Sequence, residues 1–296
     1  MLKRFRTFFT LLLVFGLSAV LIGNAAETIQ YFPETLGSYW VYEDPDGNEL
    51  TRRVVEGKEI AGEMYHAFSY EPVLEDSANY AHHIHPNFYR IGAEKVTFWV
   101  GDEVEKSLKA RLTEEMEAFL KILEKIGAPF TMLYKVETEA QDPFYVLPIP
   151  VTLNEKWKTI QIKAKITMTP FPPQDPPEAA IEFTIVETGT VVGTENVETP
   201  AGTFEDCLKI EYRTETAMEV SSPELGFGSE TPGESFTTLW VAPNIGIVKF
   251  HQKAEDIFLK VFPMPPGFEP PPPVRTPELN LELKRYEVKS ADSGGK

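Results

Sequence analysis

The chain is poor in the residues that carry most enzyme chemistry and in those that form disulfides. Cys207 is the only cysteine among 296 residues, so no disulfide can form within the chain. The sequence contains no Gly-x-Ser-x-Gly elbow, no His-Glu-x-x-His zinc motif, no Walker loop and no dinucleotide-binding glycine motif. These absences favour a protein that is not an enzyme, and we expect neither a catalytic residue nor a cofactor.

Positive charge is also scarce. The chain has 28 Lys and Arg residues against 45 Asp and Glu residues, for a net charge of −17. An acidic surface repels phosphate backbones, and no basic stripe with interleaved aromatic residues occurs, so we expect no nucleic-acid partner. The same charge disfavours docking on anionic lipid head groups through electrostatic attraction.

Residues 1–26 have the three-part pattern of a secretory signal peptide. Three basic residues precede an uncharged, mostly apolar stretch from Thr7 to Gly23, and small residues follow at 24–26. No cysteine stands directly after the apolar stretch, where a lipid anchor would be attached. The sequence therefore predicts a periplasmic or secreted protein without a lipid anchor and without an integral membrane segment after cleavage. The alternative is an uncleaved anchor, because the stretch is near the lower length limit for crossing a bilayer.

Alternation of apolar and polar residues dominates the rest of the chain. In the clearest example, every second residue is apolar and would face the same way: Ile160, Ile162, Ala164, Ile166 and Met168. A period of two is typical of a β-strand with one solvent-exposed face. Similar patterns predict a mainly β fold, with a curled antiparallel sheet or an open or half barrel. We expect a single β-rich domain over 27–290, with a helical insertion at 102–127, proline-rich loops at 170–178 and 263–277, and a disordered tail at 291–296.

One segment, at about 102–126, has helical rather than strand periodicity. Asp102 with Glu105 can cap its N-terminus, and Gly127 marks its end. Its apolar stripe is too wide to leave in water, so we expect it to form one wall of any cavity that the sheet encloses. The candidate ligand-binding residues of this wall are Leu108, Leu112, Met116, Phe119 and Leu123.

The sequence His-His-Ile-His-Pro at 82–86 is the best candidate for metal binding. On a strand, His83 and His85 would share a face, and two imidazoles at that spacing can bind zinc. A site needs a third protein ligand, however, and the sequence does not identify one. Pro86 ends the strand at once, so an exposed turn without metal is the preferred interpretation.

Cys207 is the remaining candidate nucleophile. Glu205 and Asp206 precede it, and their charges favour the neutral thiol over the reactive thiolate. Alternation places Leu208, Ile210 and Tyr212 inward, so Cys207 is predicted to face outward unless the helix or a loop covers it. We interpret it as an unreactive strand residue.

Three stretches resemble a family of exported bacterial proteins of unknown function. They are YFPETLGSYWVYED at 31–44, TPAGTFEDCLKIEY at 199–212 and LWVAPNIGIVKF at 239–250. The family pattern usually has a glycine where this chain has Asn244 and a tyrosine where it has Val241. The resemblance implies an envelope or extracellular location and a β-rich fold akin to the half-barrels of lipoprotein carriers. It implies no catalytic residue.

The leading hypothesis is therefore an exported, non-enzymatic protein that holds an apolar small molecule in the concave face of a curled sheet. A second hypothesis is a structural or interaction module with a filled core, which binds an envelope protein. A third is a metal-dependent enzyme that uses His83 and His85.

Overall fold

The computed structural model describes residues 30–74, 80–128, 131–173, 178–221, 234–254 and 278–290. The predicted signal peptide, the predicted proline-rich loop at 263–277 and the predicted tail at 291–296 lie outside these residues. So does the tip of the loop predicted at 170–178, from 174 to 177.

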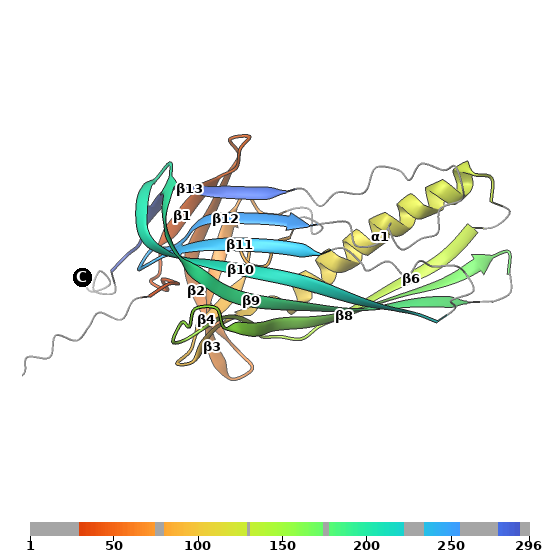
Figure 1. Cartoon of the computed structure of the whole chain (residues 1–296), viewed down its shortest axis with the longest axis horizontal. Helices are drawn as coiled ribbons and strands as arrows, with labels where there is room; N and C mark the ends of the chain where they lie inside the picture. Colours follow the sequence, from red (N-terminus) through yellow and green to blue (C-terminus); the bar gives the residue numbers. More distant parts are fainter. Residues whose placement is uncertain are drawn as a thin grey trace, which may run out of the picture.

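The described part of the chain forms one antiparallel sheet of 13 strands and one long helix, which confirms the predicted mainly β fold. The order across the sheet is β6-β8-β9-β10-β11-β12-β13-β1-β2-β3-β4-β5-β7 (Figure 1). The first strands are β1 (Tyr39–Glu43), β2 (Glu49–Ile60), β3 (Glu63–Glu71), β4 (Phe88–Ile91), β5 (Lys95–Trp99), β6 (Thr131–Ala140) and β7 (Phe144–Pro148). The others are β8 (Lys156–Phe171), β9 (Ala179–Thr199), β10 (Gly202–Val220), β11 (Ser235–Ala242), β12 (Gly246–Ala254) and β13 (Leu279–Glu287).

The sheet curls until β7, at one end of the strand order, approaches β8 and β10 near the other end. No strand ladder closes this seam among the described residues, so the sheet is an open barrel. Two side chains cross the seam instead: the Trp157 indole donates to the Tyr145 carbonyl at 3.1 Å, and the Tyr212 hydroxyl donates to the Val146 carbonyl at 2.9 Å. These bonds give two backbone carbonyls of β7 side-chain donors from β8 and β10.

The helix α1 (Gly101–Lys125) agrees with the predicted 102–126. It lies beside β6 and over the long strands β8 and β9 (Figure 1), and a bond from the Ala140 amide to Glu105 ties it to β6. The predicted Asp102 cap is wrong, because the Asp142 carboxylate accepts the amides of Val100 and Gly101 at 2.8 and 2.9 Å. Within the described residues, no helix has the length and apolarity needed to cross a membrane.

The barrel half of the molecule is filled by aromatic side chains. Phe68 and Tyr89 stack with centroids 4.3 Å apart, and Trp40 meets Phe68 edge-on at 6.2 Å. The Tyr42 hydroxyl donates to the Ile247 carbonyl at 3.0 Å, so its polar end is satisfied within the core. On β8 the predicted alternation is confirmed, because Ile160, Ile162, Ala164, Ile166 and Met168 are all buried.

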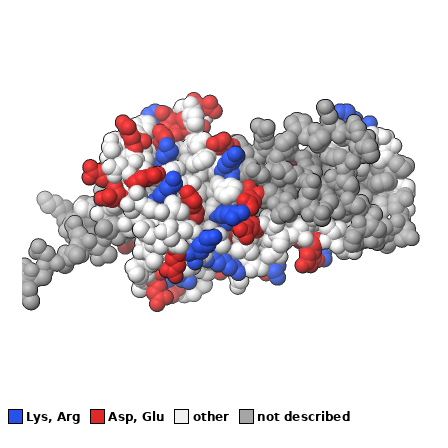
Figure 2. Space-filling view, viewed as in Figure 1, with Lys and Arg blue, Asp and Glu red and all other residues white. Residues whose placement is uncertain are grey.

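The outer face of the sheet is charged. Figure 2 shows acidic and basic side chains interspersed over the described part of this face. Many pair with residues of other strands: Lys249 on β12 with Glu282 on the adjacent β13 at 2.7 Å, and Arg285 on β13 with Glu49 on β2, across β1, at 2.8 Å. These exposed pairs keep the outer face solvated and contribute little to stability individually.

Candidate functional site

The histidine segment forms a helical turn rather than the predicted strand. The amides of Ile84 and His85 both donate to the Ala81 carbonyl, at 3.1 and 2.9 Å. His83 and His85 therefore do not share a face, as the alternative of a zinc pair on a strand would require. The predicted exposed turn is wrong, because His83 is 2% exposed and His85 is buried as well.

The turn instead brings the adjacent His82 and His83 onto one carboxylate. The Nε2 atoms of His82 and His83 lie 3.2 and 3.3 Å from Oε1 of Glu187 on β9. The His83 ring packs on Tyr212 with centroids 3.9 Å apart, and His82 lies 5.4 Å from Phe144 edge-on. We call these three side chains the His-His-Glu cluster.

Sequence reasoning missed Glu187, although a signal was present. Ile181, Phe183 and Ile185 alternate inward along β9, and Glu187 is the next residue in that register. A carboxylate at an inward position of an alternating strand needs a partner, because burying an unpaired charge is costly. Glu187 is only 5% exposed, and the two histidines are that partner.

The cluster fixes the protonation of its members. Burial lowers the pKa of His83 to about 4, with the neighbouring His82 adding to the effect, so this imidazole is neutral at pH 7. Burial opposes ionisation of Glu187, but the adjacent imidazoles of His82 and His83 hold the pKa of this carboxyl well below its usual range. At neutral pH the cluster therefore presents one carboxylate and at least one imidazole lone pair.

A small cavity of about 110 Å³ opens beside the cluster, between α1 and the concave face of the sheet. We call it the helix cavity. His82 and Glu187 form part of its lining, Val104, Ser107 and Leu108 of α1 form another part, and Ile160, Ile162 and Ile185 contribute from β8 and β9. Its volume suits a few water molecules or a very small ligand.

The predicted helix wall is largely buried in the core. Leu112, Met116, Phe119 and Leu123 all pack in the hydrophobic core, and Leu108 is the one member of the predicted set that lines the helix cavity. A role of this stripe in ligand binding stays a prediction.

His85 belongs to a different buried group. Its ring lies 5.5 Å from Tyr70 and 6.2 Å from Tyr80, and burial lowers its pKa to about 4. The Arg52 guanidinium, 2% exposed, lies nearby in the barrel over the rings of Phe68 at 4.6 Å and Trp40 at 5.0 Å. Arg52 was also missed, although its alternation with Leu50 and Val54 marks it as an inward cation.

Cys207, predicted to face outward unless the helix or a loop covers it, is fully buried. A β-bulge between Phe204 and Cys207 interrupts the pairing with β9, and Asp206 adopts a left-handed φ of 53°. Phe204, Leu208 and Ile210 keep the inward alternation on both sides of the bulge, and Cys207 is buried in addition to them. Burial, with added repulsion from Asp206, raises the pKa of the thiol to about 11.

An apolar cavity of about 680 Å³ lies at one end of the barrel. We call it the end cavity. Its lining residues come from the segment before β1, the β4–β5 turn and the chain around and after the end of β7: Gln30, Tyr31, Phe32, Ile91, Gly92, Ala93, Val96, Leu147, Ile149, Pro150 and Val151. None of them is charged. Phe32, Val96 and Leu147 are also part of the buried core, which makes this side of the cavity rigid.

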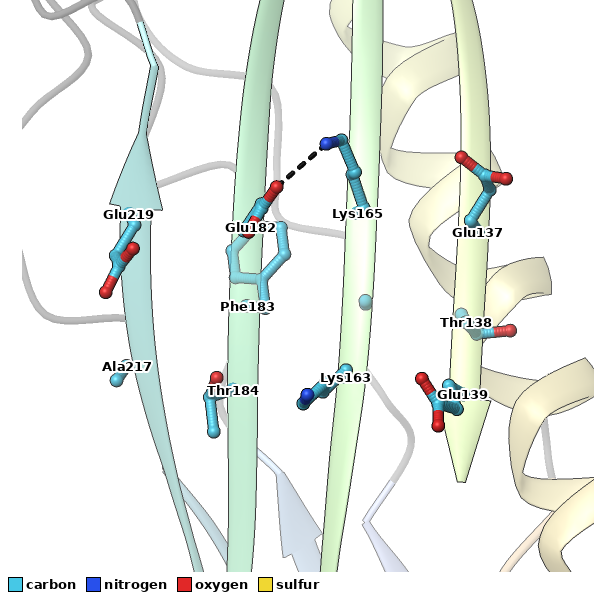
Figure 3. A pocket seen from close by; sticks show the side chains of 11 residues that line it. Glu137, Thr138, Glu139, Lys163, Lys165, Glu182, Phe183, Thr184, Ala217 and Glu219 are labelled. Carbon is cyan, nitrogen blue, oxygen red and sulfur yellow. Dashed lines mark hydrogen bonds and ion pairs between the residues drawn. The ribbon is translucent and has the colours of Figure 1, made fainter. Parts of the chain in front are cut away.

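A hollow of about 480 Å³ on strands β6, β8, β9 and β10 has the opposite character. Figure 3 shows Glu137, Lys165 and Glu182 on neighbouring strands, with Lys165 bonded to Glu182 at 2.8 Å. The hollow is open to solvent, and several charged side chains line it, so it does not enclose a small molecule. It is at most a surface for a polar partner.

Comparison with known proteins gives a partial match. The family model described as DUF3108-like matches residues 172–254, less than a third of the chain, and this range includes two of the three stretches that resemble an exported family. No curated protein matches the chain. No catalytic family is indicated by these findings.

Two solved structures are similar to the chain at low identity. One is described as "a putative lipoprotein" of Parabacteroides distasonis, with 14% identity, a TM-score of 0.37, and coverage of 88% of this chain and 100% of the other. The second is described as "a putative exported protein with YmcC-like fold" of Bacteroides fragilis, with 17% identity, a TM-score of 0.34 and the same coverage. The assignment of the fold rests on the strand pairing of this chain itself.

Proposed function

We propose that this protein is an exported, non-enzymatic carrier that holds a neutral apolar molecule in the end cavity. The observation that carries the proposal is the combination of size and lining in this cavity. Its 680 Å³ lie within the range of about 300–1,000 Å³ typical of small-molecule sites. Export is supported by the signal-peptide pattern of residues 1–26.

The lining defines the chemical class of the ligand. Gln30 is the one lining residue with an amide side chain, and Tyr31 adds a hydroxyl. A charged group enclosed there would lose its hydration without gaining an opposite charge, and that loss is costly. The ligand is therefore neutral, or keeps any charged end in solvent.

Other parts of the molecule offer less space. The barrel interior is occupied by side chains such as Trp40, Tyr89 and Phe144, which are fully buried, and the helix cavity is several times smaller than the end cavity. The proposal thus keeps the apolar ligand of the leading hypothesis and moves it from the helix wall to the end of the barrel.

The test is binding of a neutral, environment-sensitive apolar dye by the purified chain, together with native mass spectrometry for a co-purified ligand. We expect saturable binding of one dye per chain. Val151→Trp fills part of the cavity and should weaken binding by at least about tenfold, which corresponds to 1.4 kcal/mol. Leu153→Trp is the matched control, because Leu153 is exposed two residues away and does not line the cavity.

Equal dye affinity in Val151→Trp and the wild type would refute the end cavity as the site. Absence of any apolar ligand and of dye binding would refute the carrier function itself. The interaction module would then be the better hypothesis, with the filled barrel as its scaffold and the charged hollow of Figure 3 as a candidate contact surface.

A further inference from the structure

We propose that the His-His-Glu cluster is a metal site, which binds one divalent transition-metal ion, with zinc as the best fit. The proposal is independent of the carrier function, because the cluster borders the helix cavity and not the end cavity. The sequence argument against a metal rested on the lack of a third ligand. The fold supplies Glu187 as that ligand, from strand β9, about a hundred residues further along the chain.

The spacing of the potential ligand atoms is the first support. Zinc holds histidine nitrogen and carboxylate oxygen at about 2.0–2.2 Å, and in a tetrahedron such ligands lie roughly 3.3–3.6 Å from one another. The two histidine nitrogens lie 3.2 and 3.3 Å from the Glu187 oxygen. All three potential ligand atoms lie within 4.8 Å of one another, so small shifts of the side chains can place an ion between them.

The orientation of His83 is the second support. Its Nε2 lies 3.3 Å from the carboxylate oxygen, yet the nitrogen is without a hydrogen-bond partner in the described structure. A buried ring nitrogen without such a partner is costly. The His83 nitrogen and the carboxylate oxygen are close but form no hydrogen bond with each other. Two ligands of one metal ion have the same relation, because both direct their lone pairs at the ion.

The third support is the chemistry and access of the donor set. Two imidazoles and one carboxylate suit zinc and its neighbours in the first transition series, whereas magnesium and calcium prefer all-oxygen ligands. His82 and Glu187 line the helix cavity, so a fourth position is open to water or a small ligand. Three protein ligands with one open position are typical of reactive zinc sites, whereas structural sites have four.

The experiment uses the full chain produced without a histidine tag and dialysed against a chelator. Titration with zinc, followed by calorimetry and native mass spectrometry, should show one ion per chain and a higher melting temperature. Glu187→Gln keeps the size of the side chain and removes the anionic ligand. Because loss of groups that merely support a metal ligand costs about 10–100-fold in affinity, this variant should lose at least about 100-fold.

The matched control is Glu278→Gln. Glu278 pairs with His251 at 2.9 Å at an exposed position, so this variant removes a histidine–glutamate pair that lies outside the cluster. It should bind zinc as the wild type does. If Glu187→Gln does not fold by circular dichroism, His82→Gln takes its place, since His82 is the most exposed member of the cluster and its loss removes one ligand.

Cobalt substitution gives a readout that a structural role of Glu187 cannot produce. Cobalt in a tetrahedral site with nitrogen and oxygen ligands absorbs strongly in the visible range, and this band should appear in the wild type and in Glu278→Gln but not in the cluster variant. Failure of the folded wild type to bind zinc would overturn the proposal. So would unchanged zinc affinity in Glu187→Gln or His82→Gln.

Discussion

Gly189→Ala tests the seam that holds the open barrel together. Gly189 pairs with Trp157 across β8 and β9, and the indole lies directly on the glycine. A Cβ atom added at residue 189 would be 2.3 Å from Cζ2 and 2.5 Å from Cε2 of Trp157. Since carbon atoms pack at about 3.5–4.0 Å, the indole must move by more than 1 Å.

The energetic cost has two parts. Overpacking of a core position costs about 1–3 kcal/mol. Movement of the indole also lengthens its 3.1 Å bond to the Tyr145 carbonyl, and loss of that bond adds about 0.5–1.5 kcal/mol. We therefore expect Gly189→Ala to lower the free energy of unfolding by about 2–4 kcal/mol.

The assay is urea unfolding followed by far-ultraviolet circular dichroism, with Gly193→Ala as the control. Gly193 is on the same strand, and a Cβ atom there would have no neighbour within 4 Å. Its replacement should leave stability unchanged or raise it by about 0.4–1 kcal/mol through the unfolded state. In a Trp157→Phe background the cost of Gly189→Ala should shrink, because the clashing ring is smaller.

Equal stabilities of the Gly189→Ala and Gly193→Ala proteins would refute the tight contact between indole and backbone. An undiminished cost in the Trp157→Phe background would refute the attribution to the indole, because residues in contact should show coupling.

Two further predictions concern residues whose surroundings the sequence left open. Cys207 should react with an aromatic disulfide at neutral pH much more slowly than free cysteine, because its thiol is buried and burial raises its pKa to about 11; labelling at the rate of free cysteine would contradict this. Leu112→Ala should lower the free energy of unfolding by roughly 2–5 kcal/mol as a cavity-forming change, and Phe119→Ala by a similar amount. Leu108→Ala should lower the free energy of unfolding clearly less, since Leu108 already borders a cavity. Equal losses for Leu108→Ala and Leu112→Ala in chemical denaturation would contradict the burial of the stripe.

The period of apolar residues determined most of the secondary structure. Alternation on β8 places five apolar side chains inward, and the helical period at 102–126 gives α1 within one residue at each end. Both patterns are local, since each side chain's direction follows from the backbone geometry of its own segment. This is why the fold class and the helix could be predicted from the sequence.

Local patterns were insufficient where the backbone departs from regular geometry. A bulge precedes Cys207, and the turn at 82–84 replaces the strand on which the histidine spacing depends. In both places a departure of a few residues changes what surrounds a side chain. The burial of Cys207 and the separation of His83 from His85 follow from it.

The candidate sites were decided by tertiary structure alone. Glu187 meets His82 and His83 because β9 passes beneath the turn between β3 and β4, and no spacing in the sequence encodes that approach. The end cavity likewise combines three segments that the strand order brings together. The sequence by itself determined that Glu187 and Arg52 are charged residues in inward registers. The curl of the sheet determined which residues they meet, because contacts between distant strands depend on how the whole sheet bends.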